Sequence, residues 1–141
     1  MLSRCWSGKP TIGQGGKLAA QLRRQLRVDL GRDDPRADLG AQDVAVDGEG
    51  RIYGGTQDGR ILRVLRTGAV EVFAETGGRP LGLHFDADGH LIVADAWRGL
   101  LSISPAGKVT VLTTEAGGLP FGFTDDLDIS RDGTIYFSDA S

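Results

Sequence analysis

Oxygen-bearing side chains recur at one phase of a repeat in this 141-residue sequence. Alignment on three glycines gives two neighbouring columns, one with Gln42, Leu81 and Asp125 and the other with Asp43, Gly82 and Asp126. If the repeats converge on a common axis, three carboxylates and an amide would meet there. Calcium binds six to eight oxygen ligands, so these four residues are a partial ligand set. The alternative is that the acids form turns and cap the starts of strands.

The repeat that sets this phase is a short phrase written three times. It reads VDGEGRIYGG at 46–55, FDADGHLIVA at 85–94 and ISRDGTIYFS at 129–138. Each copy holds an apolar run, a turn with an acid and a glycine, and a second apolar run. Gly50, Gly89 and Gly133 are spaced by 39 and 44 residues. Four short strands in about 40 residues is the period of a β-propeller blade.

The elements that must position the acids are therefore β-strands. Glycine makes up 22 of the 141 residues, which favours many tight turns in an all-β chain. The apolar runs predict ten strands, at 43–47, 51–55, 60–65, 69–74, 81–86, 90–95, 99–104, 108–113, 125–130 and 134–139. They divide into a blade at 41–79, a blade at 80–120 and a half blade at 121–141. In HLIVA at 90–94 and TIYFS at 134–138, apolar residues follow one another directly instead of alternating with polar ones. Because a blade buries both faces, we expect such residues, including Ile92 and Tyr136, in the core.

Two and a half blades do not close a propeller, which has four to eight. We therefore expect the chain to be part of a longer protein and inactive by itself. The half blade would leave apolar residues uncovered, namely Leu127, Ile129, Ile135, Tyr136 and Phe137. An open sheet face and unpaired strand edges invite association, so contact with another chain through this face is a further expectation.

Residues 1–40 differ in composition from the repeats. Residues 1–28 carry six basic residues and no acid, so the net charge of −3 leaves −9 for the remainder. Residues 17–28 follow the spacing of a short amphipathic helix, and we treat 1–40 as an extension and linker. The acidic body argues against nucleic acid as a partner. No apolar run is long enough to span a bilayer and no signal core is expected, and the compartment stays open.

Two segments carry a resemblance to a known family. VADAWRGLLSISPAGKVTVL at 93–112 and FGFTDDLDISRDGTIYFSDAS at 121–141 resemble the strictosidine-synthase-like branch of the SMP-30/gluconolactonase/paraoxonase propellers. The resemblance covers residues 41–141 and implies a six-bladed propeller. It also implies an active-site metal, usually calcium, held in the central channel by residues that precede the innermost strands. Those positions are Gln42, Asp43, Asp125 and Asp126.

The sequence departs from the family pattern at two of these positions. Gln42 stands where relatives commonly have a glutamate, which removes one negative charge from the ligand set. Asp125 stands where relatives often have asparagine, which adds one. The glutamate that serves strictosidine-forming enzymes as acid and base lies in a later blade, so no catalytic residue is assigned here. His84 and His90 are interpreted as structural or solvated.

The leading hypothesis is a fragment of a calcium-dependent lactonase or esterase that acts on a small ester or lactone. One alternative is carbon–nitrogen bond formation of the strictosidine-synthase kind, which needs no metal. Another is a non-catalytic binding propeller of the NHL-repeat kind, since those repeats share the apolar and Asp-Gly pattern. Sensitivity to a chelator separates the first two hypotheses, and a basic or aromatic binding surface would favour the third.

Overall fold

The structure is a computed structural model, and it describes residues 43–140. Within this range it holds strands and turns and no helix. The first blade contains β1 (Val44–Val46), β2 (Ile52–Gly55), β3 (Arg60–Val64) and β4 (Val70–Glu75), paired in chain order. The second blade contains β5 (Pro80–Phe85), β6 (Leu91–Asp95), β7 (Gly99–Ile103) and β8 (Val109–Thr113), also in chain order. The half blade is the pair β11 (Thr124–Ile129) and β12 (Ile135–Asp139).

The repeated phrase forms the first hairpin of each unit. β1 pairs with β2, β5 with β6 and β11 with β12, all antiparallel. Gly50, Gly89 and Gly133 close the three turns with φ of 80°, 82° and 86°. Side chains with a Cβ rarely adopt this conformation, so each turn needs glycine there. The recurrence in the sequence therefore reflects one hairpin built three times.

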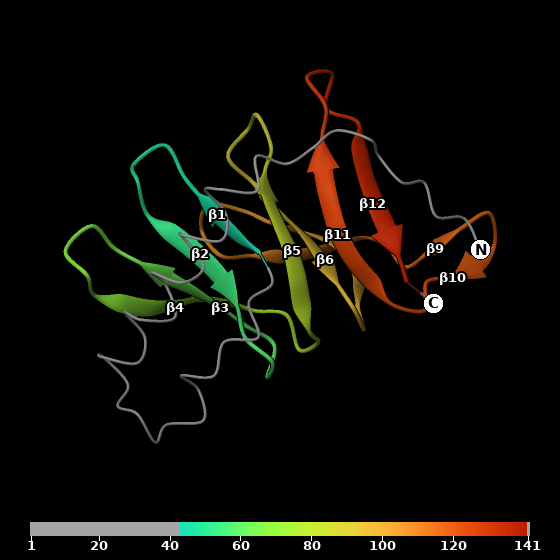
Figure 1. The fold of residues 1–141 in the computed structure, drawn as a ribbon, viewed down its shortest axis with the longest axis horizontal. Helices are drawn as coiled ribbons and strands as arrows, with labels where there is room; N and C mark the ends of the chain where they lie inside the picture. The colour runs from blue at the N-terminus through green and yellow to red at the C-terminus, as the bar shows by residue number, and fades with distance from the viewer. Residues whose placement is uncertain (1–42, 141) are drawn as a thin grey trace.

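Apolar side chains join the blades into one body. Figure 1 shows β5 and β6 of the second blade between the strands of the first blade and the β11–β12 pair. Between the first and second blades the buried cluster includes Tyr53, Ile61, Leu83 and Val93. The Tyr53 ring meets Phe85 of the second blade edge-on, with centroids 5.0 Å apart. Full burial of an apolar side chain of this size contributes about 1.5–3 kcal/mol. Packing of this kind holds neighbouring blades face to face.

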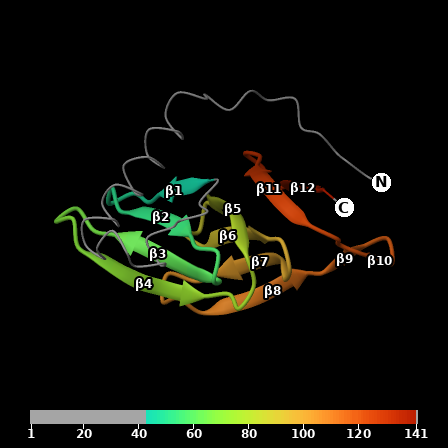
Figure 2. The ribbon, with the colours of Figure 1, turned by 60° about the horizontal axis from the view of Figure 1, so that its bottom comes forward.

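A second cluster joins the second blade to the half blade. Ile92, Ala94 and Leu100 are buried against Leu127, and the cluster also takes in Ile129, Ile135 and Phe137. Figure 2 shows the sheet β1–β4 next to the sheet β5–β8, with β11 and β12 on the side of the second sheet away from the first. Tyr136 lies on the other side of β12 from this cluster and is 39% exposed, so the prediction that it belongs to the core is wrong: the described residues place nothing apolar over that face. The predicted all-β fold of two blades and a half blade is confirmed.

The connections between blades differ in length. Residues 76–79 link the first two blades, whereas residues 114–123 lead from β8 to β11 and include a small hairpin. The hairpin pairs β9 (Glu115–Ala116) with β10 (Leu119–Pro120), and the strand pattern did not predict it. These extra residues account for the longer second spacing of the repeat.

The predicted helix at 17–28 lies outside the described residues. Within the described range, no helix is long and apolar enough to cross a membrane.

Candidate functional site

The inner strands bring two of the predicted acids toward each other. β1 and β11 both contact β5, and these three are the first strands of their units. Asp43 directly precedes β1, and Asp125 and Asp126 are the second and third residues of β11. The structure thus places Asp43 and the Asp125–Asp126 pair at the same end of two inner strands that both pack against β5. Gln42, the fourth predicted ligand, lies outside the described residues.

Gly82 is the reason that β11 can approach β5 so closely. A Cβ added to Gly82 would lie 3.1 Å from the Asp125 carbonyl oxygen and 3.1 Å from the Asp126 Cα. It would also lie 3.2 Å from the Leu127 nitrogen. These are backbone atoms, so a side chain at Gly82 would force the start of β11 to move by a few tenths of an ångström. Glycine in the column between Asp43 and Asp126 therefore sets how near the acids lie.

Asp43 connects the first two blades through backbone hydrogen bonds. Its Oδ1 accepts a hydrogen bond from Val44 N at 2.9 Å, and its Oδ2 accepts one from Leu83 N at 3.2 Å. Burial raises the pKa of Asp43, and the negative charge of Asp126 raises it further, while the two hydrogen bonds and His84 act in the opposite direction. Asp43 is half-buried, and a half-buried carboxyl group beside another carboxylate is a place where a cation would relieve repulsion.

Asp125 and Asp126 differ in their surroundings. Asp126 is exposed, and its Oδ1 accepts a hydrogen bond from Leu127 N at 2.8 Å. Asp125 is half-buried, and no described residue donates a hydrogen bond to its carboxylate. The preceding Thr124 is fully buried, and its Oγ1 has no hydrogen-bond partner among the described residues. The start of β11 therefore presents oxygen atoms that the described part of the protein leaves unsatisfied.

The capping interpretation of these acids also has support. Asp43 and Asp126 each accept a hydrogen bond from the amide of the next residue, so both cap the start of an inner strand. For Asp126 this contact uses one oxygen, and the other oxygen receives no hydrogen bond from residues 43–140. Capping and ligand binding are therefore compatible at Asp126.

The chemistry of the donors fits calcium, but their number does not complete a site. Carboxylate and hydroxyl oxygens are hard ligands of the kind that calcium takes. Within residues 43–140, no three His, Cys, Asp or Glu side chains lie close enough together to hold a metal ion. A calcium ion bound here would thus take the rest of its ligands from water or from residues outside 43–140.

Sequence reasoning did not identify the buried carboxylate Asp95. Its Oδ2 accepts a hydrogen bond from Thr76 Oγ1 at 2.7 Å. Its Oδ1 accepts hydrogen bonds from the backbone nitrogens of Arg79 at 2.8 Å and of Trp97 and Arg98 at 3.0 Å each. Asp139 ends β12 as Asp95 ends β6, and it accepts hydrogen bonds from Gly122 N and Phe123 N. The sequence did contain a signal for this carboxylate: Asp95 and Asp139 are 44 residues apart, the same spacing as Gly89 and Gly133, so they form a third acidic column of the repeat.

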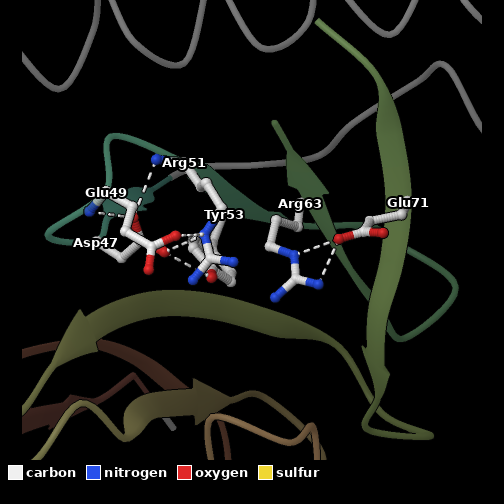
Figure 3. A network of polar contacts seen from close by, with 6 residues as sticks. All are labelled: Asp47, Glu49, Arg51, Tyr53, Arg63 and Glu71. Atoms are coloured by element: carbon white, nitrogen blue, oxygen red, sulfur yellow. Dashed lines mark hydrogen bonds and ion pairs between the residues drawn. The ribbon is translucent and has the colours of Figure 1, made fainter. Parts of the chain in front are cut away.

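The first blade contains a network of charged and polar side chains that has a structural role (Figure 3). Tyr53 is 2% exposed, and its hydroxyl donates a hydrogen bond to Asp47 Oδ2 at 2.9 Å. Arg51 Nε donates to the same oxygen at 2.6 Å, while Arg63 pairs with Glu71 on the neighbouring strand. Burial favours a higher pKa for Asp47, but the hydrogen bonds from Arg51 and Tyr53 outweigh it and lower the pKa. Every charge in this network has a partner, so it fixes the hairpin and offers no ligand site.

Comparison with known proteins gives similarity in both sequence and fold. A family model described as strictosidine synthase-like, N-terminal, matches residues 43–64. Protein strictosidine synthase-like 4 of Arabidopsis thaliana is 48% identical over 96 residues, covering 64% of this chain and 26% of that protein. The adipocyte plasma membrane-associated protein of Salmo salar is 35% identical over 122 residues, covering 73% of this chain and 29% of that protein. The chain therefore spans about a quarter to a third of the length of these relatives.

Among solved structures, a gluconolactonase from Xanthomonas campestris is similar, with a TM-score of 0.63 and 23% identity. The match covers 68% of this chain and 33% of that protein. A streptogramin B lyase has a TM-score of 0.59 at 16% identity, with 72% of this chain and 35% of that protein covered. At such identities the likeness concerns the fold alone, and one fold serves different chemistries.

Proposed function

We propose that this chain is part of a calcium-dependent hydrolase of a small ester or lactone. The proposal is supported by the sequence similarity of the chain to strictosidine-synthase-like proteins and by its fold, which is similar to that of a gluconolactonase. The observation that carries the proposal is the start of β11, where Asp125 has no described hydrogen-bond donor and Thr124 Oγ1 is buried without a partner. A buried polar atom without a partner is rare, and a bound ion or water beside Thr124 Oγ1 would satisfy it.

The roles of the residues follow from their contacts. Asp125 and Asp126 would provide carboxylate oxygens to the ion, and Gln42 would add an amide oxygen if it follows the repeat. Asp43 already has a hydrogen bond on each oxygen, so we assign it to holding the first blade against the second and to adding negative charge. Calcium bound here would polarise the ester carbonyl and lower the pKa of an attacking water.

Charge supports the choice of a cation over a neutral ligand. The pKa of Asp43 is raised by burial first and by Asp126 second, so the metal-free site holds unfavourable negative charge. A divalent cation would remove this penalty, and folding and binding would then support each other.

Calorimetric titration of the 141-residue chain with calcium tests the proposal. We expect saturable binding with a Kd of about 10⁻³–10⁻⁴ M, since few ligands are present, and its loss in Asp125→Ala. Asp88→Ala is the matched control, because Asp88 is an exposed acid in the DADG turn of the second blade. Absence of binding, or equal binding by Asp125→Ala, would refute the assignment.

Hydrolysis of lactones and aryl esters, measured with and without a chelator on a protein that contains all six blades, tests the reaction itself. Activity that the chelator abolishes supports the hydrolase. Hydrolysis that the chelator leaves intact would show that the reaction needs no metal and would refute the calcium-dependent assignment.

A further inference from the structure

His84 lies on β5 opposite Asp128 on β11, which puts a histidine–aspartate pair across the boundary that carries the candidate acids. His84 Nε2 lies 3.2 Å from Asp128 Oδ1. The other ring nitrogen, Nδ1, lies 3.1 Å from the carbonyl oxygen of Phe85. A carbonyl oxygen and an ionised carboxylate only accept hydrogen bonds, so the contacts are satisfied together when both ring nitrogens carry a proton. The His84 ring is thus held between two hydrogen-bond acceptors, one on β5 itself and one on β11.

This pair belongs to one blade boundary only. Ala45 occupies the column of His84 in the first blade, so the boundary between the first two blades has no counterpart to it. There the connection is made by Asp43 and the Leu83 amide. At the boundary with the half blade, β11 is fixed by the close approach at Gly82, by Leu127 in its apolar pocket and by His84. The His84 contact is the polar one of these three.

Asp128 links His84 to the acids, because it contacts His84 and lies on the same strand as Asp125 and Asp126. It lies two residues after Asp126 and three after Asp125 on the same strand. Leu127, between them, is buried against Ile92 and Ala94 of the second blade. A shift of Asp128 relative to β5 would therefore displace the start of β11, where the unsatisfied oxygens lie.

We propose that His84 is a positioning residue, which acts through Asp128 to hold Asp125 and Asp126 in place against β5. The proposal deepens the calcium-dependent function and rests on it. The pair is partly exposed, with side-chain exposures of 44% and 36%, so its contribution is modest. Its importance lies in geometry, because a metal site loses affinity when the residues that orient its ligands are lost.

Four variants of the 141-residue chain test the role by calcium titration. We expect His84→Gln and Asp128→Asn each to weaken calcium binding about two- to five-fold. The double variant should bind no more weakly than the weaker single variant, since both substitutions break the same contact. His84→Lys, which keeps a positive partner for Asp128, should recover most of the affinity. His90→Gln is the matched control, because His90 is the other histidine and lies 3.9 Å from Asp86 in a turn.

Amide hydrogen exchange without calcium separates this inference from the proposed function. We expect faster exchange at Leu127–Ile129 in His84→Gln, and wild-type exchange there in His90→Gln. If the wild-type chain binds no calcium, the proposed function fails, and exchange alone decides whether His84 holds β11. Unchanged exchange at β11 would overturn the inference, and so would unchanged calcium affinity in His84→Gln or additive effects in the double variant.

Discussion

Replacement of Asp95 by asparagine should lower the free energy of unfolding by about 3 kcal/mol, because the hydrogen bonds to this side chain would no longer be made to a charged group. Asp95 is 0% exposed and receives hydrogen bonds from one hydroxyl and three backbone amides. Asparagine has nearly the same shape, and its oxygen can keep the three amides. Its NH₂ group would then face Thr76 Oγ1, which can accept that bond and donate its own proton to the Gly59 carbonyl at 3.2 Å. All contacts can persist, and only the negative charge is lost.

The magnitude follows from the number of charge-assisted bonds. A hydrogen bond to a charged group contributes about 1.5–3 kcal/mol and a neutral one about 0.5–1.5 kcal/mol. Three backbone bonds that each lose about 1 kcal/mol give a total of about 3 kcal/mol. This is a large part of the 5–15 kcal/mol typical of a domain, but the variant should still fold. Asp95→Ala is less informative, because it would leave three buried amides without any acceptor.

Urea unfolding followed by far-ultraviolet circular dichroism measures the effect. Asp86→Asn is the matched control, because Asp86 Oδ1 also accepts two backbone amides, those of Asp88 and His90, at 2.9 Å each, in an exposed turn. The control should lose less than about 1 kcal/mol, since water can replace the lost charge assistance. Equal losses in the two variants would show that burial of Asp95 does not strengthen its bonds, and the reasoning would fail.

Three further outcomes are expected. Gly82→Ala should cost about 1–3 kcal/mol and weaken calcium binding, because the new Cβ would press on the backbone of β11 at Asp125; urea unfolding and calorimetry measure both. Tyr53→Phe should cost about 1–2 kcal/mol above pH 4 by removing a hydrogen bond to ionised Asp47. The depressed pKa of Asp47 means that its stabilisation is lost as pH falls through the folded-state value, so the cost should vanish in acid. For Asp43 the raised pKa reverses the sign: stability should fall as pH rises from 3.8 through the folded-state value, and Asp43→Asn should lack this fall in thermal unfolding.

The fold was predictable because its signal is periodic. Three glycines at positive φ and an apolar–acid–glycine phrase define the same hairpin in each unit, and these depend on local backbone preferences. The β9–β10 hairpin was missed because its two-residue strands have no apolar alternation to recognise.

The candidate site was only partly predictable. The column of Asp43 and Asp126 was visible because equivalent positions of neighbouring blades lie side by side. The pairing of His84 with Asp128 was not visible, since a contact between different strands depends on how side chains lean across the boundary. Asp95 could be seen only as a column shared with Asp139, and burial made it important. The sequence repeat shows which residues occupy equivalent positions, but the role of each residue depends on its burial and on the side chains that it contacts.

The half blade has a consequence for the order in which the structure opens. Among the described residues, β11 and β12 pair only with each other and rest on the second blade through one apolar cluster and the His84–Asp128 contact, whereas the second blade is packed on both faces. Elements held by fewer buried contacts open at lower free energy than the core. Detachment of this hairpin would carry Asp125 and Asp126 away while the first two blades stayed folded. If a cation binds at these acids, as proposed above, its binding would favour the docked state of the β11–β12 hairpin.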